Sequence, residues 1–372
     1  MDNDKQGLSR TGFAWDEWFM WHNTGLTGGL APAGGWVEPY ASIENPETKR
    51  RIKNLLDRSR LTERMVPIRA RQATDKELCY FHTPDYLERF KALSAGPGGM
   101  AGPGAPAGTD SFEIAALSVG ALLETVDHVV RGDVKNAYAL LRPPGHHAVA
   151  DSAYGLCMFG NVAIAAHHAQ RVHKMQRIAI LDYDAHHGNG AQEAFYSDPS
   201  VLTMSIHQRS WYGLKGEISE RGEGAGDGAN INIPLPAGSG DGAYIASLER
   251  VIIPALRRFQ PDLIFIGAGF DISAFDLLSS MVVSSEGFRQ MARMLVDAAS
   301  EICDGRIIFE QEGCSNPYTA PFSVLVTIEE VTGIKTGIED PFFGLIEASP
   351  DRQLQPHQEA VIQEVQDAFG LR

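Results

Sequence analysis

The sequence predicts one α/β domain in which a parallel β-sheet is covered by helices on both faces. Short apolar runs with β-branched residues alternate along the chain with amphipathic stretches, the order expected of strands and helices in such a sheet. The 372 residues are 44% hydrophobic and 21% charged, which are ordinary globular values and exclude a disordered chain.

Each element follows from its own run of residues. The expected strands are residues 137–141, 177–183, 201–207, 262–267 and 306–310. The expected helices are residues 112–130, 161–174, 243–259 and 286–302. Ligands of such folds bind at the carboxyl ends of the strands, so a functional site is expected there.

Two glycine- and proline-rich segments, residues 23–46 and 94–110, interrupt this pattern. The second could link two domains, but the residues before it lack a core pattern of their own. We therefore expect a surface loop within a single domain of residues 1–372. The first segment carries the apolar residues Leu26, Leu30, Trp36 and Val37 among its glycines. Apolar loop residues need cover, which predicts either a homo-oligomer (a dimer or tetramer) or packing against the same domain.

Composition narrows the functional classes. The 32 basic and 47 acidic residues give a net charge of 32 − 47 = −15, which argues against binding to nucleic acid. Four scattered cysteines without a Cys-x-x-Cys pair argue against a disulfide framework and a thiolate zinc site. The sequence shows no secretory signal and no apolar run long enough to span a membrane, so we expect a cytoplasmic protein without a membrane partner.

Polar residues follow each expected strand. These segments are Arg142–His147, Asp182–Gly190, Ser205–His207, Gly269–Asp271 and Glu312–Ser315. Because the carboxyl ends of parallel strands meet at one edge of the sheet, metal-capable side chains from five segments are expected to gather there.

Asp184 and His186 form the strongest metal-ligand pair in the sequence. Residues two apart in an extended segment point to the same side, so both can reach one ion, with Asp182 one step deeper. Asp271, at the end of another strand, is the third ligand of this hypothesis. Carboxylate and imidazole suit Zn²⁺, Fe²⁺ or Mn²⁺, and three protein ligands leave a position open for water and substrate. The alternative, in which Asp182 and Asp184 only cap loops, would bury carboxylates without a cation.

A single catalytic metal is expected. A dinuclear site of the arginase kind would place carboxylates where this chain has Gly188 and Ser273. His146 and His147 follow a Pro-Pro-Gly turn, which suits a general base and acid acting beside a metal. The histidine pair at 167–168 lies inside an expected helix and is interpreted as surface or packing residues. Serine-hydrolase chemistry is disfavoured, because no Gly-x-Ser-x-Gly elbow follows a strand.

Together these motifs resemble the histone deacetylase superfamily, most of all its bacterial histone deacetylase-like amidohydrolases and acetylpolyamine amidohydrolases. The residues that carry the resemblance are RPPGHH (142–147), YGLCMFGN (154–161), LDYDAHHGNG (181–190), TMSIHQ (203–208), GAGFD (267–271) and QEG (311–313). They occur in the family's order and span about half of the chain. One motif alone would be weak, whereas the combination is highly specific.

The resemblance implies an α/β domain of the arginase–deacetylase type that hydrolyses a small acylated amine or amide. It implies one Zn²⁺ held by Asp184, His186 and Asp271. It also implies a structural K⁺ near Asp182, Asp184, His186 and Ser205, bound in part by backbone carbonyl groups. In the implied reaction, metal-activated water attacks the amide carbonyl and releases a carboxylate and an amine.

The same resemblance gives roles to catalytic residues. His146 and His147 would be the tandem histidines, oriented by Asp182 and Asn189 in that order. Family deacetylases carry a tyrosine after the Glu-Gly-Gly of their last motif, and this chain has Ser315 at that position. A serine is too short to reach the same substrate oxygen directly, and the loss of one such donor typically costs about 10²–10³ in rate.

Ser315 leaves alternatives open. Either the protein is a poor acetyl-lysine deacetylase, or it acts on a more electrophilic acyl group, or another donor replaces the tyrosine. Tyr318 is the nearest candidate donor, and Ser315 itself could act through a water molecule.

The expected substrate pocket also departs from the family. Its expected residues are Gly155, Leu156, Tyr212 and Gly313, with Trp211 as the alternative to Tyr212. Leu156 stands where the family commonly has an aromatic residue, which favours a substrate other than a slim acetyl-lysine arm. The first hypothesis is a zinc amidohydrolase for acylated amines. The alternatives are a hydrolase of an ester, thioester or xenobiotic amide, and a catalytically weak zinc protein that binds acylated ligands.

Overall fold

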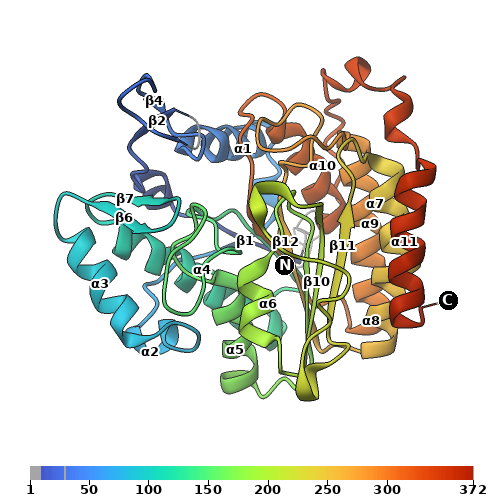
Figure 1. Cartoon of the computed structure of the whole chain (residues 1–372), viewed down its shortest axis with the longest axis horizontal. Helices are drawn as coiled ribbons and strands as arrows, with labels where there is room; N and C mark the ends of the chain where they lie inside the picture. Colours follow the sequence, from blue (N-terminus) through green and yellow to red (C-terminus); the bar gives the residue numbers. More distant parts are fainter. Residues whose placement is uncertain (1–9, 29–30, 372) are drawn as a thin grey trace, which may run out of the picture.

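Eight parallel strands form the central sheet of the molecule (Figure 1), which runs in the order β11-β10-β9-β12-β13-β8-β1-β5. The computed structural model describes residues 10–28 and 31–371. The strands of the sheet are β1 (Thr11–Ala14), β5 (Val66–Ile68), β8 (Asn136–Ala139), β9 (Ile178–Asp182), β10 (Val201–Gln208), β11 (Asn230–Leu235), β12 (Leu263–Ala268) and β13 (Ile307–Gln311). Every pair of neighbours in this sheet is parallel.

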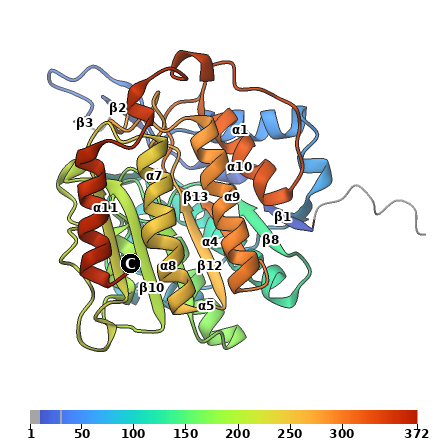
Figure 2. The same ribbon diagram turned by 90° about the vertical axis from the view of Figure 1, so that its right-hand side faces the viewer.

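Helices cover both faces of the sheet, as Figures 1 and 2 show. Figure 2 looks onto the face that carries α7, α8, α9, α10 and α11, and α4 and α5 lie behind the strands. The helices are α1 (Pro46–Arg58), α2 (Asp75–Leu78), α3 (Pro84–Ser94), α4 (Ser111–Arg131), α5 (Asn161–His173), α6 (Asn189–Phe195), α7 (Asp241–Ser247), α8 (Ile253–Phe259), α9 (Ser285–Ile302), α10 (Ala320–Thr332) and α11 (Pro356–Phe369). The predicted α/β class is therefore confirmed.

Strand β9 shows why both faces are buried. Ile178 and Ile180 belong to the apolar cluster under α4 and α5, whereas Ala179 and Leu181 belong to the cluster under α7–α11. Successive side chains of a strand point to opposite faces, so a strand with a helix layer on each side must be apolar throughout. This explains the short continuous apolar runs that the sequence shows.

The five predicted strands correspond to β8, β9, β10, β12 and β13. The predicted helix 243–259 is divided into α7 and α8 by the π-helical turn Leu248–Ile252. The sequence pattern did not reveal β1 and β5, because each has only three or four residues, nor β11, in which asparagine alternates with isoleucine.

The two glycine-rich segments are not structureless. Segment 23–46 contains the antiparallel strands β2 (Leu26–Gly28), β3 (Ala31–Pro32) and β4 (Tyr40–Ala41), which form a projecting arm at the upper left of Figure 1. Leu30 lies outside the described residues. Segment 94–110 contains the hairpin β6 (Gly99–Gly102) and β7 (Ala105–Ala107). Strands from both sides of this hairpin pair in one sheet, and the single-domain organisation stays a prediction.

Among the described residues, no helix has the length and apolar character that crossing a membrane requires.

The sheet brings the chemistry-bearing segments to one edge. Strand β9 lies between β10 and β12, and β13 follows β12. Asp182 is the last residue of β9, and Gly269 follows the last residue of β12. Because all strands run in the same direction, the residues after them lie together at the carboxyl end of the sheet.

Candidate active site

Three predicted metal ligands converge after β9 and β12. Side-chain ligand atoms of Asp184, His186 and Asp271 all lie within 4.8 Å of one another. His186 Nδ1 is 2.9 Å from Asp184 Oδ1 and 2.9 Å from Asp271 Oδ2. Both carboxylates are completely buried. Two buried carboxylates this close need a cation or a proton between them.

The chemistry of this group fits a zinc ion. Asp271 Oδ2 is buried and has no hydrogen-bond partner within the described residues, although His186 Nδ1 lies 2.9 Å away. The other oxygen, Asp271 Oδ1, accepts a hydrogen bond from the Ala185 backbone N–H at 2.9 Å, which fixes the carboxylate. The free lone pair of Asp271 Oδ2 therefore lies beside the His186 nitrogen. A metal ion that takes nitrogen and oxygen ligands would bind to both atoms.

Gly313 closes the site from the end of β13. Its backbone N–H donates to Asp184 Oδ2 at 2.8 Å. A Cβ at this position would contact Asp184 Oδ2 and would lie 2.7 Å from Asp271 Oδ2. Only glycine lets the chain come this close to both carboxylates. Gly313 thus shapes the metal-binding group as well as the pocket.

The tandem histidines lie beside this group with their rings 3.8 Å apart. His146 Nδ1 is 2.9 Å from Asp182 Oδ2, and His147 Nδ1 is 2.7 Å from Asn189 Oδ1. The partner of His146 is therefore a carboxylate, and the partner of His147 is an amide. Asn189 also donates to the His147 carbonyl at 3.1 Å, so its own orientation is fixed.

The surroundings of the two histidines shift their pKa values in opposite directions. Burial lowers the pKa of His146, but the charges of Asp184 and Asp182 outweigh it and raise that pKa to about 10. Burial also lowers the pKa of His147, and the neighbouring charges of His146 and His186 lower it further, well below its usual value. A pair of groups with pKa values driven apart is typical of an acid and a base in one site.

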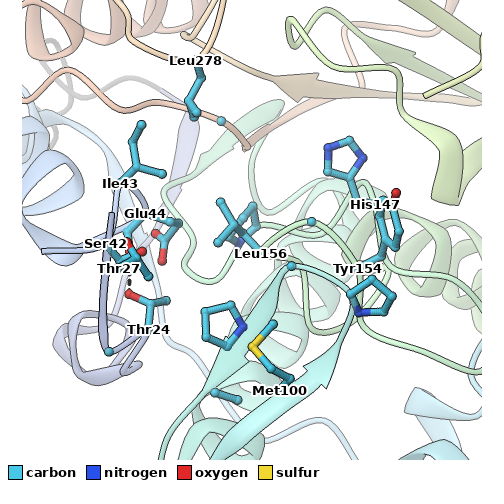
Figure 3. Close-up of a pocket in the computed structure, with 18 of the residues that line it drawn as sticks. Thr24, Thr27, Ser42, Ile43, Glu44, Met100, His147, Tyr154, Leu156 and Leu278 are labelled. Atoms are coloured by element: carbon cyan, nitrogen blue, oxygen red, sulfur yellow. Dashed lines mark hydrogen bonds between the residues drawn. The ribbon is translucent and has the colours of Figure 1, made fainter. Parts of the chain in front are cut away.

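A cavity of about 680 Å³ leads to these residues (Figure 3). Gly155, Leu156 and Tyr212 line it, as the sequence predicted, together with Gly313. The Tyr212 ring lies 5.2 Å from the His186 ring in a stacked arrangement. Gly155 has a φ of 49°, and a Cβ there would lie 2.7 Å from the His147 ring, so glycine is required at this turn.

Ser315 points away from the predicted catalytic position. Its hydroxyl donates to Asp276 Oδ1, and its backbone N–H donates to Asp276 Oδ2 at 2.7 Å. Its Oγ also accepts a hydrogen bond from the Leu277 N–H at 3.1 Å. The cavity reaches Gly313 and Cys314, but the part of its lining that the structure describes does not include Ser315. These contacts hold the segment after β12 to the segment after β13.

Tyr318, the other candidate donor, is not among the described residues of the cavity lining. Its ring is mostly exposed, and the Arg51 guanidinium lies 5.3 Å from the ring centre. Tyr154 and Tyr212 are the tyrosines among the described residues of the cavity lining. Tyr154 meets the His147 ring edge-on at 6.2 Å. Among the described residues, the tyrosines of the cavity lining thus come from segments other than the one that follows β13.

A family model described as the histone deacetylase domain matches residues 42–330. The chain belongs to the histone deacetylase family. It is 42% identical over 368 residues to the histone deacetylase-like amidohydrolase of Pseudomonas aeruginosa, and the match covers 97% of both chains. It is 34% identical over 319 residues to the human "Polyamine deacetylase HDAC10", covering 80% of this chain and 46% of the relative.

The same relationship holds in three dimensions. The crystal structure of the HDA15 HD domain matches with a TM-score of 0.84 at 28% identity, covering 96% of this chain and 95% of that one. This histone deacetylase-family protein is accordingly a hydrolase that acts on the amide bonds of acylated amines. The family as a whole depends on zinc, and the group Asp184, His186 and Asp271 is suited to hold it.

The potassium site remains a prediction. Ser205 is buried at the centre of β10, and its Oγ lies 2.9 Å from His207 Nδ1. Asp182 Oδ1 accepts a hydrogen bond from the Asp184 N–H at 2.9 Å. These contacts show where the two residues lie and how they are engaged.

The histidine pair of α5 packs in the interior rather than near the catalytic group. His168 is buried and its Nε2 lies 2.7 Å from Asp127 Oδ1 of α4, with His173 Nε2 2.6 Å from the same oxygen. His167 contacts the ring of Phe195, with 4.7 Å between ring centres. The pair joins helices, in agreement with its interpretation as packing residues.

Sequence reasoning missed the inner end of the cavity. Ser42, Glu44, Lys49 and Cys314 line it, as does Met100 nearer the surface. One feature of the sequence could have drawn attention to Lys49. It lies in the first turn of a helix, where the helix dipole disfavours a positive charge.

Proposed function

We propose that this histone deacetylase-family protein is a zinc-dependent amidohydrolase of small acylated amines. The observation that carries the proposal is the convergence of Asp184, His186 and Asp271 beside two differently partnered histidines. A zinc ion held by those three residues would supply Lewis-acid activation of the amide carbonyl and of water.

The histidines would divide the proton transfers. His147 Nδ1 faces the amide oxygen of Asn189 and so carries a proton, which leaves Nε2 free to accept one from the attacking water. As water oxygen bonds to the carbonyl carbon and the carbon–nitrogen bond breaks, that proton passes to the leaving amine. His146, held by Asp182, stays protonated and stabilises the negative charge that develops on the carbonyl oxygen.

The orientation of Ser315 supports a preference for activated acyl groups. Its hydroxyl is bonded to Asp276 and gives no donor to the carbonyl. An ester, a thioester or an amide with an electron-poor acyl group needs less help from such a donor. Hydrolysis of such activated substrates is the second candidate function.

The mouth of the cavity favours a largely apolar substrate arm. Leu26 and Met100 are exposed there, and Leu156 and Leu278 line the same cavity. Figure 3 shows Met100 and Leu278 on opposite sides of Leu156. Apolar walls gain little from a polycationic arm and more from alkyl or aryl groups. We infer a monoacylated amine or amide with an apolar body, and no nucleic-acid partner.

The test compares matched acetyl-lysine and trifluoroacetyl-lysine reporters with zinc-loaded protein. Wild type is expected to cleave the trifluoroacetyl reporter at least 100-fold better, and His147→Ala is expected to abolish both activities. Asp271→Asn is expected to lower bound zinc per chain, measured by mass spectrometry of the metal. Equal turnover of both reporters by wild type would contradict the preference, and full activity of His147→Ala would contradict the mechanism.

A further inference from the structure

Ser42, Glu44, Lys49 and Cys314 line the same cavity as the candidate catalytic residues, and we call these four residues the inner arm. Exposure differs steeply among the lining residues. Met100 and Tyr212 at the mouth are about half exposed, whereas Lys49 is only 1% exposed. The inner arm is thus an enclosed end that can accept the smaller of the two groups joined by a scissile amide.

Lys49 of the inner arm shares Glu44 with Arg142, which is not among the described residues of the cavity lining. Glu44 Oε1 accepts a hydrogen bond from Arg142 Nε at 2.8 Å and one from Lys49 Nζ at 3.4 Å, so two cations share one carboxylate oxygen. His22 is also buried beside Arg142, and burial together with that charge lowers its pKa to about 3, so it adds no charge at neutral pH. Glu310 and Glu312 bond other groups, Asn161 and the backbone at 145–146, and do not line the cavity within the described residues.

Several donors in this region are not used by the protein. In the part of the chain that the structure describes, the bond to Glu44 is the one hydrogen bond of Lys49 Nζ, which has three N–H donors. The Ser42 hydroxyl is buried without a partner among the described residues, as are the acceptor Glu44 Oε2 and, outside the described cavity lining, Arg142 Nη2. Buried cations and donors normally find acceptors, because leaving them unpaired is costly. An anionic acceptor would satisfy them.

We propose that the inner arm binds a carboxylate carried by the acyl group, so that the preferred substrates are monoamides of dicarboxylic acids, such as succinylated or glutarylated amines. This rests on the proposed function, because it takes the acyl group to be the smaller partner in the amide. The cation at Lys49 also fixes the direction of binding, since it attracts a carboxylate and repels an ammonium group. Lys49 is then a specificity-determining residue.

The experiment compares butyryl, succinyl and glutaryl groups on one lysine reporter. Butyryl and succinyl have the same number of carbons and differ in the terminal carboxylate. We expect kcat/KM for at least one carboxylated substrate to exceed that for butyryl by tenfold or more. Lys49→Met is expected to remove that advantage. Lys53→Met, one turn further along α1 and paired with the exposed Asp57, is the matched control and should change none of the three.

A binding measurement separates this proposal from the proposed function. Calorimetry on the zinc-loaded full chain should show succinate or glutarate binding at least tenfold tighter than butyrate, with the difference lost in Lys49→Met. Ser42→Ala, which keeps the ion pairs, should weaken the dicarboxylate several-fold and carries the test if Lys49→Met fails to fold. Equal binding of succinate, glutarate and butyrate, or an equal loss of all three acyl substrates in Lys49→Met, would overturn the proposal. No turnover of any acyl substrate, with dicarboxylate binding intact, would count against the proposed function alone.

Discussion

Ser315 links two segments of the chain through Asp276. Its hydroxyl and N–H both reach Asp276, and Leu277 N–H reaches its Oγ, so the side chain joins two loops beside the catalytic group. We expect Ser315→Ala to lower the free energy of unfolding by about 1–2 kcal/mol, because buried Asp276 loses a donor. The ratio of acetyl to trifluoroacetyl turnover should stay unchanged.

Denaturant titration with both reporters checks this prediction. Thr319→Val is the matched control, since it removes a buried hydroxyl that has no partner within the described residues, and stability should change little. If Ser315→Ala instead alters the turnover ratio tenfold at unchanged stability, the serine acts on the substrate.

The ionised carboxylate of Glu44 makes the stability of the fold depend on pH. Burial alone would raise the pKa of Glu44, but the charges of Arg142 and Lys49 hold it at about 2, against 4.5 in the unfolded chain. A lowered pKa stabilises the fold above pH 4.5, and that contribution is lost as pH falls towards 2. The shift corresponds to about 3 kcal/mol.

We therefore expect the stability gap between wild type and Glu44→Gln to narrow as pH falls. The gap should be largest at pH 7 and about half as large at pH 3, measured by urea unfolding at both values. Titrations common to both proteins cancel in this difference. A gap that is the same at the two pH values would show that Glu44 is not held ionised by its neighbours.

Among the helices, α4 and α5 depend on one shared carboxylate. Asp127 Oδ1 of α4 receives both His168 and His173 of α5, and Asp127 is mostly buried. We expect Asp127→Asn to lower the free energy of unfolding by about 1–2 kcal/mol, since one amide oxygen without charge replaces a charged acceptor. Thermal or denaturant unfolding measures this, with the exposed Glu88→Gln as a control that should stay within about 0.5 kcal/mol. An unchanged Asp127→Asn protein would show that apolar packing alone holds the two helices.

Strand and helix prediction succeeded where periodicity was long enough to read. Strand β9 and helix α9 each show a full apolar pattern, and Ser284 marks the start of α9 by accepting a hydrogen bond from the Gly287 N–H. Strand β1 has only four residues, too few for a period, and its place in the sheet depends on pairing with β5 and β8. Pairing between strands that are far apart in the chain cannot be predicted from a short stretch of sequence.

The convergence of the three candidate metal ligands was predictable for a different reason. Asp184, His186 and Asp271 follow buried strands, and the rule that parallel strands end at one edge brings them together without knowing any contact. The inner arm had no such rule. Glu44 and Lys49 lie before and within α1. The packing of α1 against α10 and the short helical turn Glu17–Trp21 places both residues in the cavity lining.

Segment 23–46 forms a projecting arm whose exposed side chains include large apolar residues. Trp36 and Tyr40 are exposed on segment 23–46, while Leu26 of the same arm reaches the mouth of the cavity. We expect wild type to be a homo-oligomer and the double variant Trp36→Ser and Tyr40→Ser to be a monomer, because the arm would lose its apolar contact surface. Light scattering at several concentrations measures the mass. Leu345→Ser, at an exposed position outside the arm, should keep the wild-type mass, and a monomeric wild type would contradict the prediction.

The order of strands has a consequence for synthesis of the chain on the ribosome. Asp184 and His186 are made early, but Asp271 and Gly313 come about 90 and 130 residues later (271 − 184 = 87; 313 − 184 = 129). Strands β12 and β13 must insert between β9 and β8, which already exist when those strands emerge. The candidate ligands Asp184 and His186 therefore emerge before the strands that complete the middle of the sheet, so the candidate metal-binding group can assemble only late in synthesis.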